Sequence, residues 1–231
     1  MSDFGVRPLS LDDLEWTSGL HRRGLRPSFF SELGPGYLRA YHASFVTSPH
    51  AFGLVALVDG EGAGFAFVTT NGPAHYRTVV RRCGVRLAIR GGAALAVRPR
   101  LLVHFVTTRG RRYARGARRL GRSAPKAAVA RLQRPTAEVV HVVVDDRWRG
   151  AGLGSWLIAH VELTVRGLGS QAIEAKTYDA ASFYEANGWQ RAGDAADLEG
   201  GTLQILRLAL DAGEQPSDQR HAADLSANAR R

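Results

Sequence analysis

The chain has 231 residues, enough for one domain with a sizeable core. Its single cysteine, Cys83, excludes an intramolecular disulfide and a thiolate metal cluster. No apolar run reaches the roughly 18 residues that a membrane-spanning helix needs, and the N-terminus lacks the pattern of a signal peptide. We therefore expect a cytoplasmic protein.

The formal net charge of +10 comes from one segment. Residues 71–137 contain 17 of the 31 basic residues and none of the 21 acidic ones. Arginine outnumbers lysine by 29 to 2, which is typical of a GC-rich bacterial genome, but such a bias does not remove acidic residues from 67 consecutive positions. The segment therefore needs a local cause, such as an anionic partner.

The first 70 residues predict short alternating elements. A strand is expected over 6–9, followed by a helix that Ser10 caps. Apolar residues at helical spacing over 29–45 are interrupted by Gly34-Pro35-Gly36, which predicts two helical pieces. The mostly apolar residues 54–58 and 64–69 flank the turn 59–62, and this pattern predicts a hairpin.

The basic segment begins with a predicted amphipathic helix. Its apolar stripe consists of Tyr76, Val79, Val80, Cys83 and Leu87, with Arg82, Arg86 and Arg90 on another face. The pair Gly91-Gly92 is expected to interrupt the helix. Three roles remain open for the segment: a nucleic-acid surface, which few aromatic residues support; a face for an anionic membrane; or a lid that packs its stripe on the core, which we favour.

Residues 138–154 predict a buried strand, a polar turn and the glycine-rich start of a helix. Glycines let the backbone approach a ligand, and the unpaired N–H groups of a first helical turn attract phosphate. A Walker loop is excluded because no Lys follows the last glycine. A dinucleotide fingerprint fits poorly because Gly150, Gly152 and Gly154 alternate and do not follow the strand directly.

Two motifs carry a resemblance to a known family. The run from Arg149 to Gly154 fits the R-x-x-G-x-G/A signature of the GNAT superfamily of acyl-CoA transferases, and Phe183-Tyr184-Glu185-Ala186-Asn187-Gly188-Trp189 is similar to its downstream FYxxxGF segment. Thr177 departs from the Asn that many relatives carry.

The resemblance implies an α/β (α+β) fold over 1–210: a mixed, mostly antiparallel sheet of six or seven strands flanked by helices and splayed at the cofactor. The basic, partly helical segment 71–137 is inserted between the third and fourth strands. The polar residues 211–231 predict a disordered tail.

The resemblance also implies roles for particular residues. Acetyl-CoA would bind to the following backbone and side-chain groups: Val142, Val143, Val144, Arg149, Gly150, Ala151, Gly152, Leu153, Gly154 and Ser155. Glu138 resembles the general base of part of the superfamily, and Tyr184 resembles the acid that protonates the leaving thiolate. For both, the alternative is an ordinary structural role. His141 lies three residues after Glu138 and should point to the opposite face of a regular strand, so a structural histidine is favoured. Cys83 is expected to be a buried hydrophobe rather than a nucleophile.

The expected function is transfer of an acetyl group from acetyl-CoA to a primary amine of a small molecule or peptide, without a metal. The alternative is a non-catalytic module with the same fold, which the basic insertion recruits to an anionic membrane, such as the inner face of the cell membrane, or to nucleic acid, the latter being less favoured. The acceptor and the oligomeric state are not specified by the sequence.

Overall fold

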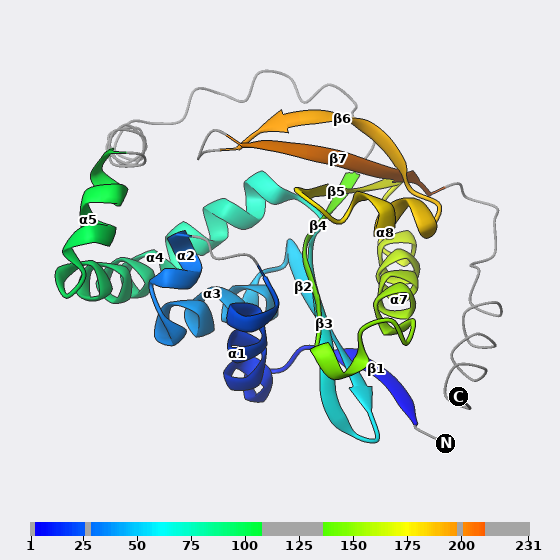
Figure 1. The fold of residues 1–231 in the computed structure, drawn as a ribbon, viewed down its shortest axis with the longest axis horizontal. Coiled ribbons are helices and arrows are strands. Elements are labelled where there is room, and N and C mark those ends of the chain that lie inside the picture. Colours follow the sequence, from blue (N-terminus) through cyan, green and yellow to red (C-terminus); the bar gives the residue numbers. More distant parts are fainter. Residues whose placement is uncertain (1–2, 26–28, 108–135, 198–200, 211–231) are drawn as a thin grey trace.

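The computed structural model describes residues 3–25, 29–107, 136–197 and 201–210. Seven strands form one sheet in the order β1-β2-β3-β4-β5-β7-β6 (Figure 1). They are β1 (Phe4–Pro8), β2 (Ala51–Val58), β3 (Glu61–Thr69), β4 (Thr136–Val144), β5 (Ala172–Thr177), β6 (Gln190–Ala196) and β7 (Thr202–Ala209). All neighbours pair antiparallel except β4 and β5. The predicted mixed, mostly antiparallel sheet is confirmed, while the predicted tail, 211–231, lies outside the described residues.

Helices cover both faces of the sheet (Figure 1). Those outside the insertion are α1 (Leu14–Gly24), α2 (Phe29–Glu32), α3 (Pro35–Thr47), α7 (Leu153–Gly167) and α8 (Ala181–Ala186). On the α7 face, Leu157 and Val161 pack with Val68 of β3. On the α1 and α3 face, Leu20 and Phe45 pack with aromatic residues of β3. Because both faces bury apolar side chains, the central strands are mostly apolar.

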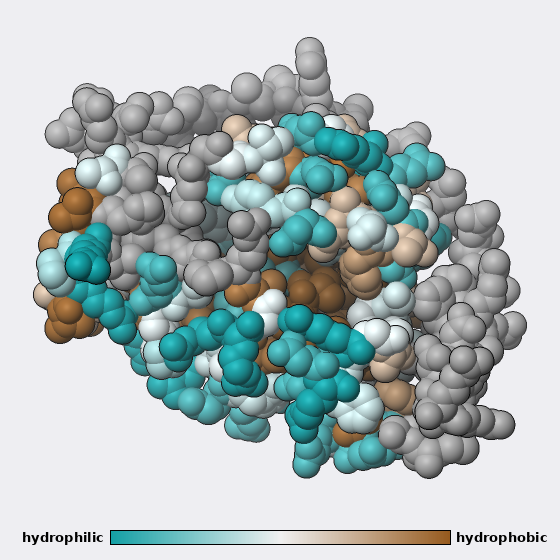
Figure 2. Space-filling model, in the orientation of Figure 1, coloured by the Kyte–Doolittle hydropathy of each residue, from teal (hydrophilic) through white to brown (hydrophobic). Residues whose placement is uncertain are grey.

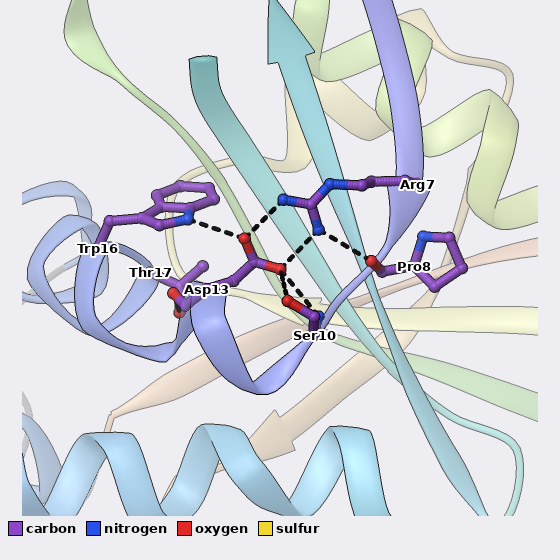
Figure 3. Close-up of polar contacts among 6 residues, drawn as sticks. All are labelled: Arg7, Pro8, Ser10, Asp13, Trp16 and Thr17. Atoms are coloured by element: carbon purple, nitrogen blue, oxygen red, sulfur yellow. Dashed lines mark hydrogen bonds and ion pairs between the residues drawn. The ribbon is translucent and has the colours of Figure 1, made fainter. Parts of the chain in front are cut away.

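The buried carboxylate of Asp13 joins β1 to the start of α1 (Figure 3). Arg7 donates to its two oxygens at 2.6 and 2.7 Å, and the backbone N–H of Ser10 donates to Oδ2 at 2.8 Å. Trp16 Nε1 donates to Oδ1 at 3.1 Å. The Arg7 guanidinium holds the pKa of the Asp13 carboxyl well below its usual range. The predicted cap at Ser10 is present as a capping box, although the first turn, Leu11–Asp13, is a 3₁₀ turn.

The insertion joins two neighbouring strands, β3 and β4, and its described part forms α4 (Gly72–Ala96) and α5 (Pro99–Phe105). The expected interruption at Gly91-Gly92 is wrong, since α4 continues through both glycines. A Cβ on Gly91 would lie 3.7 Å from the ring of Tyr37 on α3. Gly91 therefore lies in the contact between α4 and α3, and this packing offsets the low helix propensity of glycine.

Strand β4 has a bulge that shapes the site. His141 pairs with Phe67 and Val139 with Val68, so Val140 is the extra residue opposite β3. On its other side, β4 pairs with β5 only from Thr136 to Val139. Beyond this point the two parallel strands separate, and the sheet splays as the family resemblance implied.

Candidate functional site

The predicted phosphate site forms the turn that leads into α7. Gly152 is the N-cap, with φ 84° and ψ −3°, and Gly150 has φ 77°, a left-handed conformation that favours glycine. No side chain caps this end of α7, and the backbone N–H groups of Leu153, Gly154 and Ser155 have no partner among the described residues. Such N–H groups, at the positive end of the helix dipole, are suited to a phosphate.

Arg149 and the side chain of Leu153 contribute differently to this turn. Arg149 is 55% exposed, and its Nη2 lies 3.0 Å from Asp146 Oδ1. The Leu153 side chain is fully buried, so only its backbone faces the turn. A Cβ on Gly150 would meet no atom within 4 Å, which leaves room for a ligand here. These residues fit the pyrophosphate of acetyl-CoA.

The two sequence motifs meet in space. A Cβ on Gly154 would lie 3.2 Å from Cε2 of Phe183, so the start of α7 packs against α8. The next residue, Tyr184, is 7% exposed and contacts the rings of Phe183 and Trp189, at centroid distances of 5.1 and 4.9 Å. Burial raises the pKa of Tyr184, which keeps its hydroxyl protonated at neutral pH. The hydroxyl makes no hydrogen bond within the described residues.

The valines before the turn expose backbone rather than side chains to the splayed region. Val143 is buried against α1, and Val142 and Val144 pack on the α7 face. Because β5 pairing ends at Val139, the β5-side edge of β4 from Val140 onward has no partner strand among the described ones. This edge can accept hydrogen bonds from an extended chain such as pantetheine.

Glu138 lies near the other end of the splay. Its Oε1 accepts a hydrogen bond from Lys176 Nζ at 2.7 Å, and the two side chains are 38% and 39% exposed. A Cβ on Gly72, at the start of α4, would lie 3.7 Å from Glu138 Oε2. The insertion therefore begins beside the predicted base.

His141 does not point to the opposite face from Glu138, and this expectation is wrong because of the bulge at Val140. The Tyr41 hydroxyl lies 3.4 Å from His141 Nε2, and burial, together with the Glu138 charge, raises the pKa of Tyr41. Tyr41 thus lies near both residues. A bulge shifts the alternation of side chains by one, which brings Glu138 and His141 to one face.

Sequence reasoning missed two further histidines of this face, His21 on α1 and His42 on α3. The His21 ring lies 4.7 Å from that of His141 and 5.2 Å from that of His42, between centroids. Burial lowers the pKa of His21 to about 4 and that of His141 to about 3, so both are neutral at pH 7. The four-residue spacing of Thr17 and His21, which puts both polar side chains on one face of α1, was the available signal.

A family model described as an acetyltransferase (GNAT) domain matches residues 103–191. A comparison with curated protein sequences found no match. Within the described residues, no group of three or more His, Cys, Asp or Glu side chains could hold a metal ion, and no helix has the length and apolarity to cross a membrane.

Solved structures of N-acetyltransferases share the fold at low identity. The ribosomal-protein-S18-alanine N-acetyltransferase from Escherichia coli is 11% identical, with a TM-score of 0.52 over 92% of this chain and 97% of its own. A spermidine N-acetyltransferase from Vibrio cholerae is 12% identical, with a TM-score of 0.54 over 90% and 94%. The protein yncA from Salmonella typhimurium, solved with its cofactor acetyl-CoA, is 13% identical, with a TM-score of 0.53 over 93% and 98%. The resemblance read from the two motifs is confirmed: residues 103–191 match an acetyltransferase (GNAT) domain, and solved acetyltransferases share the fold.

Proposed function

We propose that the protein transfers the acetyl group of acetyl-CoA to a primary amine. The observation that supports this proposal is the contact between Gly154 and Phe183, which brings the turn before α7 next to α8, the helix that carries Tyr184. The pyrophosphate would bind the N–H groups of Leu153 to Ser155, with Arg149 beside it. The acetyl thioester would lie along the backbone of Val142 to Val144.

In the proposed reaction the amine nitrogen attacks the thioester carbon directly. The new C–N bond forms, the C–S bond breaks, and Tyr184 supplies the proton that the leaving sulfur takes up. A neutral amine is required, and an alkyl ammonium with a pKa near 10.4 is rarely deprotonated at pH 7. Glu138, directly or through water, would remove the proton, although its ion pair with Lys176 has to loosen first.

The acceptor class is suggested by the names of the structural neighbours, which include a spermidine and a ribosomal-protein acetyltransferase. We expect amine-dependent release of the CoA thiol with one member of a panel that contains a polyamine, an aminoglycoside and an alanine-terminated peptide. A thiol-reactive dye measures the release. If acetyl-CoA binds but no amine in an extended panel increases release, acetyl transfer to amines is contradicted.

The alternative of a non-catalytic module has no support in the comparisons, but an anionic membrane remains a candidate partner of the enzyme. Aliphatic side chains stand exposed on α4 and α5: Val85 (76%), Ile89 (66%), Val97 (75%), Leu102 (41%), Val103 (62%) and Val106 (56%). Figure 2 shows hydrophobic residues gathered at this end of the molecule. The predicted stripe is only partly correct, since Tyr76 is 62% exposed.

The arginines of α4 divide into two sets. Arg82 Nη1 donates to the Thr47 carbonyl at 3.2 Å and Arg90 Nη1 to the Gly36 carbonyl at 2.6 Å, so these two contact α3 while both residues remain exposed. The Arg86 side chain lies outside the described residues. Arg77 and Arg81 are exposed and make no hydrogen bond or ion pair to the described residues. They remain available to anionic lipid.

We therefore expect the protein to co-sediment with vesicles that contain anionic lipid and to dissociate as salt is added. Changing Val85 and Ile89 together to Asp should abolish binding, because the membrane-facing apolar area is lost and negative charge is added. Leu168→Asp is the matched control, since Leu168 is also 60% exposed but lies at the end of α7. Equal binding to neutral vesicles, or none to either, contradicts membrane docking; salt-sensitive retention of DNA without lipid binding points to nucleic acid.

A further inference from the structure

A chain of buried hydrogen bonds links α1 and α3 on the face of the sheet that carries His141. Thr17 Oγ1 donates to the Asp13 carbonyl at 2.8 Å and lies 3.0 Å from His42 Nδ1. His42 Nε2 lies 3.2 Å from His21 Nδ1. Thr17 and His42 are completely buried and His21 is 4% exposed, so bulk water does not compete for these bonds.

The carbonyl at one end fixes the direction of every proton in this chain. A carbonyl only accepts, so the single hydroxyl hydrogen of Thr17 is committed to Asp13, and Thr17 Oγ1 must accept from His42 Nδ1–H. Burial lowers the pKa of His42 to about 2, so the ring is neutral and its Nε2 carries a lone pair. That lone pair accepts from His21 Nδ1–H. The remaining ring nitrogen of neutral His21, Nε2, is therefore unprotonated.

The Nε2 of His21 is left for a ligand or solvent. Within the described part of the chain, this nitrogen forms no hydrogen bond. It is also not among the unpaired side-chain atoms there that are fully shielded from solvent. The His21 ring stands edge-on to that of His141, with 75° between their planes. One turn later, a Cβ on Gly24 would lie 2.5 Å from Val143 Cγ1 and 3.7 Å from Arg149 Nη2. The helix segment that carries His21 thus lies on the stretch of β4 proposed to hold the thioester.

We propose that His21 is a catalytic base of this enzyme, with Thr17 and His42 as the positioning residues that fix its tautomer. This inference rests on the proposed amine acetylation. The amine nitrogen forms the C–N bond, the C–S bond breaks with its electron pair on sulfur, and the proton that the amine loses passes to His21 Nε2. In this proposal His21 Nε2 replaces Glu138 as the acceptor of the amine proton, because the Glu138 carboxylate is paired with Lys176 while this nitrogen has its lone pair uncommitted.

Other ionisable groups surround the base from each packed element. His42 faces it from α3 and His141 from β4, and Tyr41 of α3 contacts both of those rings. Arg149 approaches the next turn of α1. Glu138 is close enough to Tyr41 to influence it. Burial keeps His42, His141 and Tyr41 neutral at pH 7. It also keeps His21 unprotonated through the neutral range.

Substitution of His21 by Asn tests the role of the ε nitrogen. Asn retains a donor at the δ position for His42 but has no ε nitrogen. Acetyl-CoA affinity should therefore be kept while kcat falls by about tenfold or more. The loss of kcat should diminish as pH rises, because the amine then deprotonates without help. Thr17→Val removes the group that fixes the tautomer and should also lower kcat. Thr17→Ser, which restores the hydroxyl, should recover it. Unchanged kcat and pH profile in His21→Asn overturn the proposal.

Nitrogen NMR of the full chain provides a readout without turnover. We expect Nδ1–H tautomers for His21 and His42 in the wild type from pH 6 to 8, with a mixed tautomer in Thr17→Val. An Nε2–H tautomer of His21 in the wild type overturns the proposal even if the variants cannot be assayed. Failure of the proposed function looks different, because the wild type itself would then acetylate no amine.

Discussion

Replacing Gly152 with Asp should reduce acetyl-CoA affinity by about 10²-fold or more. The residue caps α7 with a left-handed backbone, and the unpaired N–H groups of the first turn follow it. A carboxylate here would stand close to the pyrophosphate. At about 5 Å and an effective dielectric constant near 20, each pair of like charges costs about 3 kcal/mol, or about 10²-fold in affinity. Titration calorimetry with acetyl-CoA measures the change.

Gly152→Asn is the matched control for charge. Asn and Asp are similar in size and both tolerate the left-handed conformation, so the backbone strain is shared between them. We expect the Asn variant to bind acetyl-CoA much better than the Asp variant. Equal affinities would assign the loss to backbone strain, and a folded wild type that binds no acetyl-CoA at millimolar concentration would show that the turn is not a phosphate site.

Changing Tyr184 to Phe should lower kcat by about 10² or more with little change in acetyl-CoA affinity, because general acid catalysis typically contributes that much. The substitution keeps the ring against Phe183 and Trp189 and removes only the hydroxyl. Burial holds the pKa of Tyr184 above its usual value, so the wild-type hydroxyl is protonated throughout the neutral range. Steady-state thiol release and calorimetry separate turnover from binding.

The control for Tyr184→Phe is Tyr76→Phe, which removes a hydroxyl from an exposed ring on α4. This variant should match the wild type. Thermal unfolding of Tyr184→Phe should also remain close to the wild type, since the buried ring is retained. If turnover is unchanged while thiol release is shown to limit the rate, Tyr184 has only a packing role.

Local sequence signals predicted the elements that local physics determines. The capping box at Ser10, the hairpin of β2 and β3, and the strand, turn and helix around Gly152 all depend on residues close in sequence. The structure also brings the two sequence motifs into contact. Their contact through Gly154 and Phe183 follows once the two segments flank β5.

The features that sequence reasoning missed depend on partners far along the chain. A bulge at Val140 is defined only by its register with β3, so His141 was assigned to the wrong face. The continuity of α4 at Gly91 depends on the ring of Tyr37, which the periodicity of α4 does not contain. The chain from Thr17 to His21 requires α3 to pack on α1, and no residue spacing indicates that His42 comes between them.

The length of α4 has a consequence for the choice of substrate. The helix starts beside the Glu138 carboxylate and has 25 residues, so at 1.5 Å per residue its far end lies about 37 Å away along the axis. The proposed docking residues Arg77, Arg81, Val85 and Ile89 follow one another at four-residue intervals along this length, so they lie on one side of α4. A membrane bound along that side would extend from the far end of the helix back toward Glu138. Amines carried by the head groups of that membrane would then lie near the site, which links the choice of substrate to the docking surface.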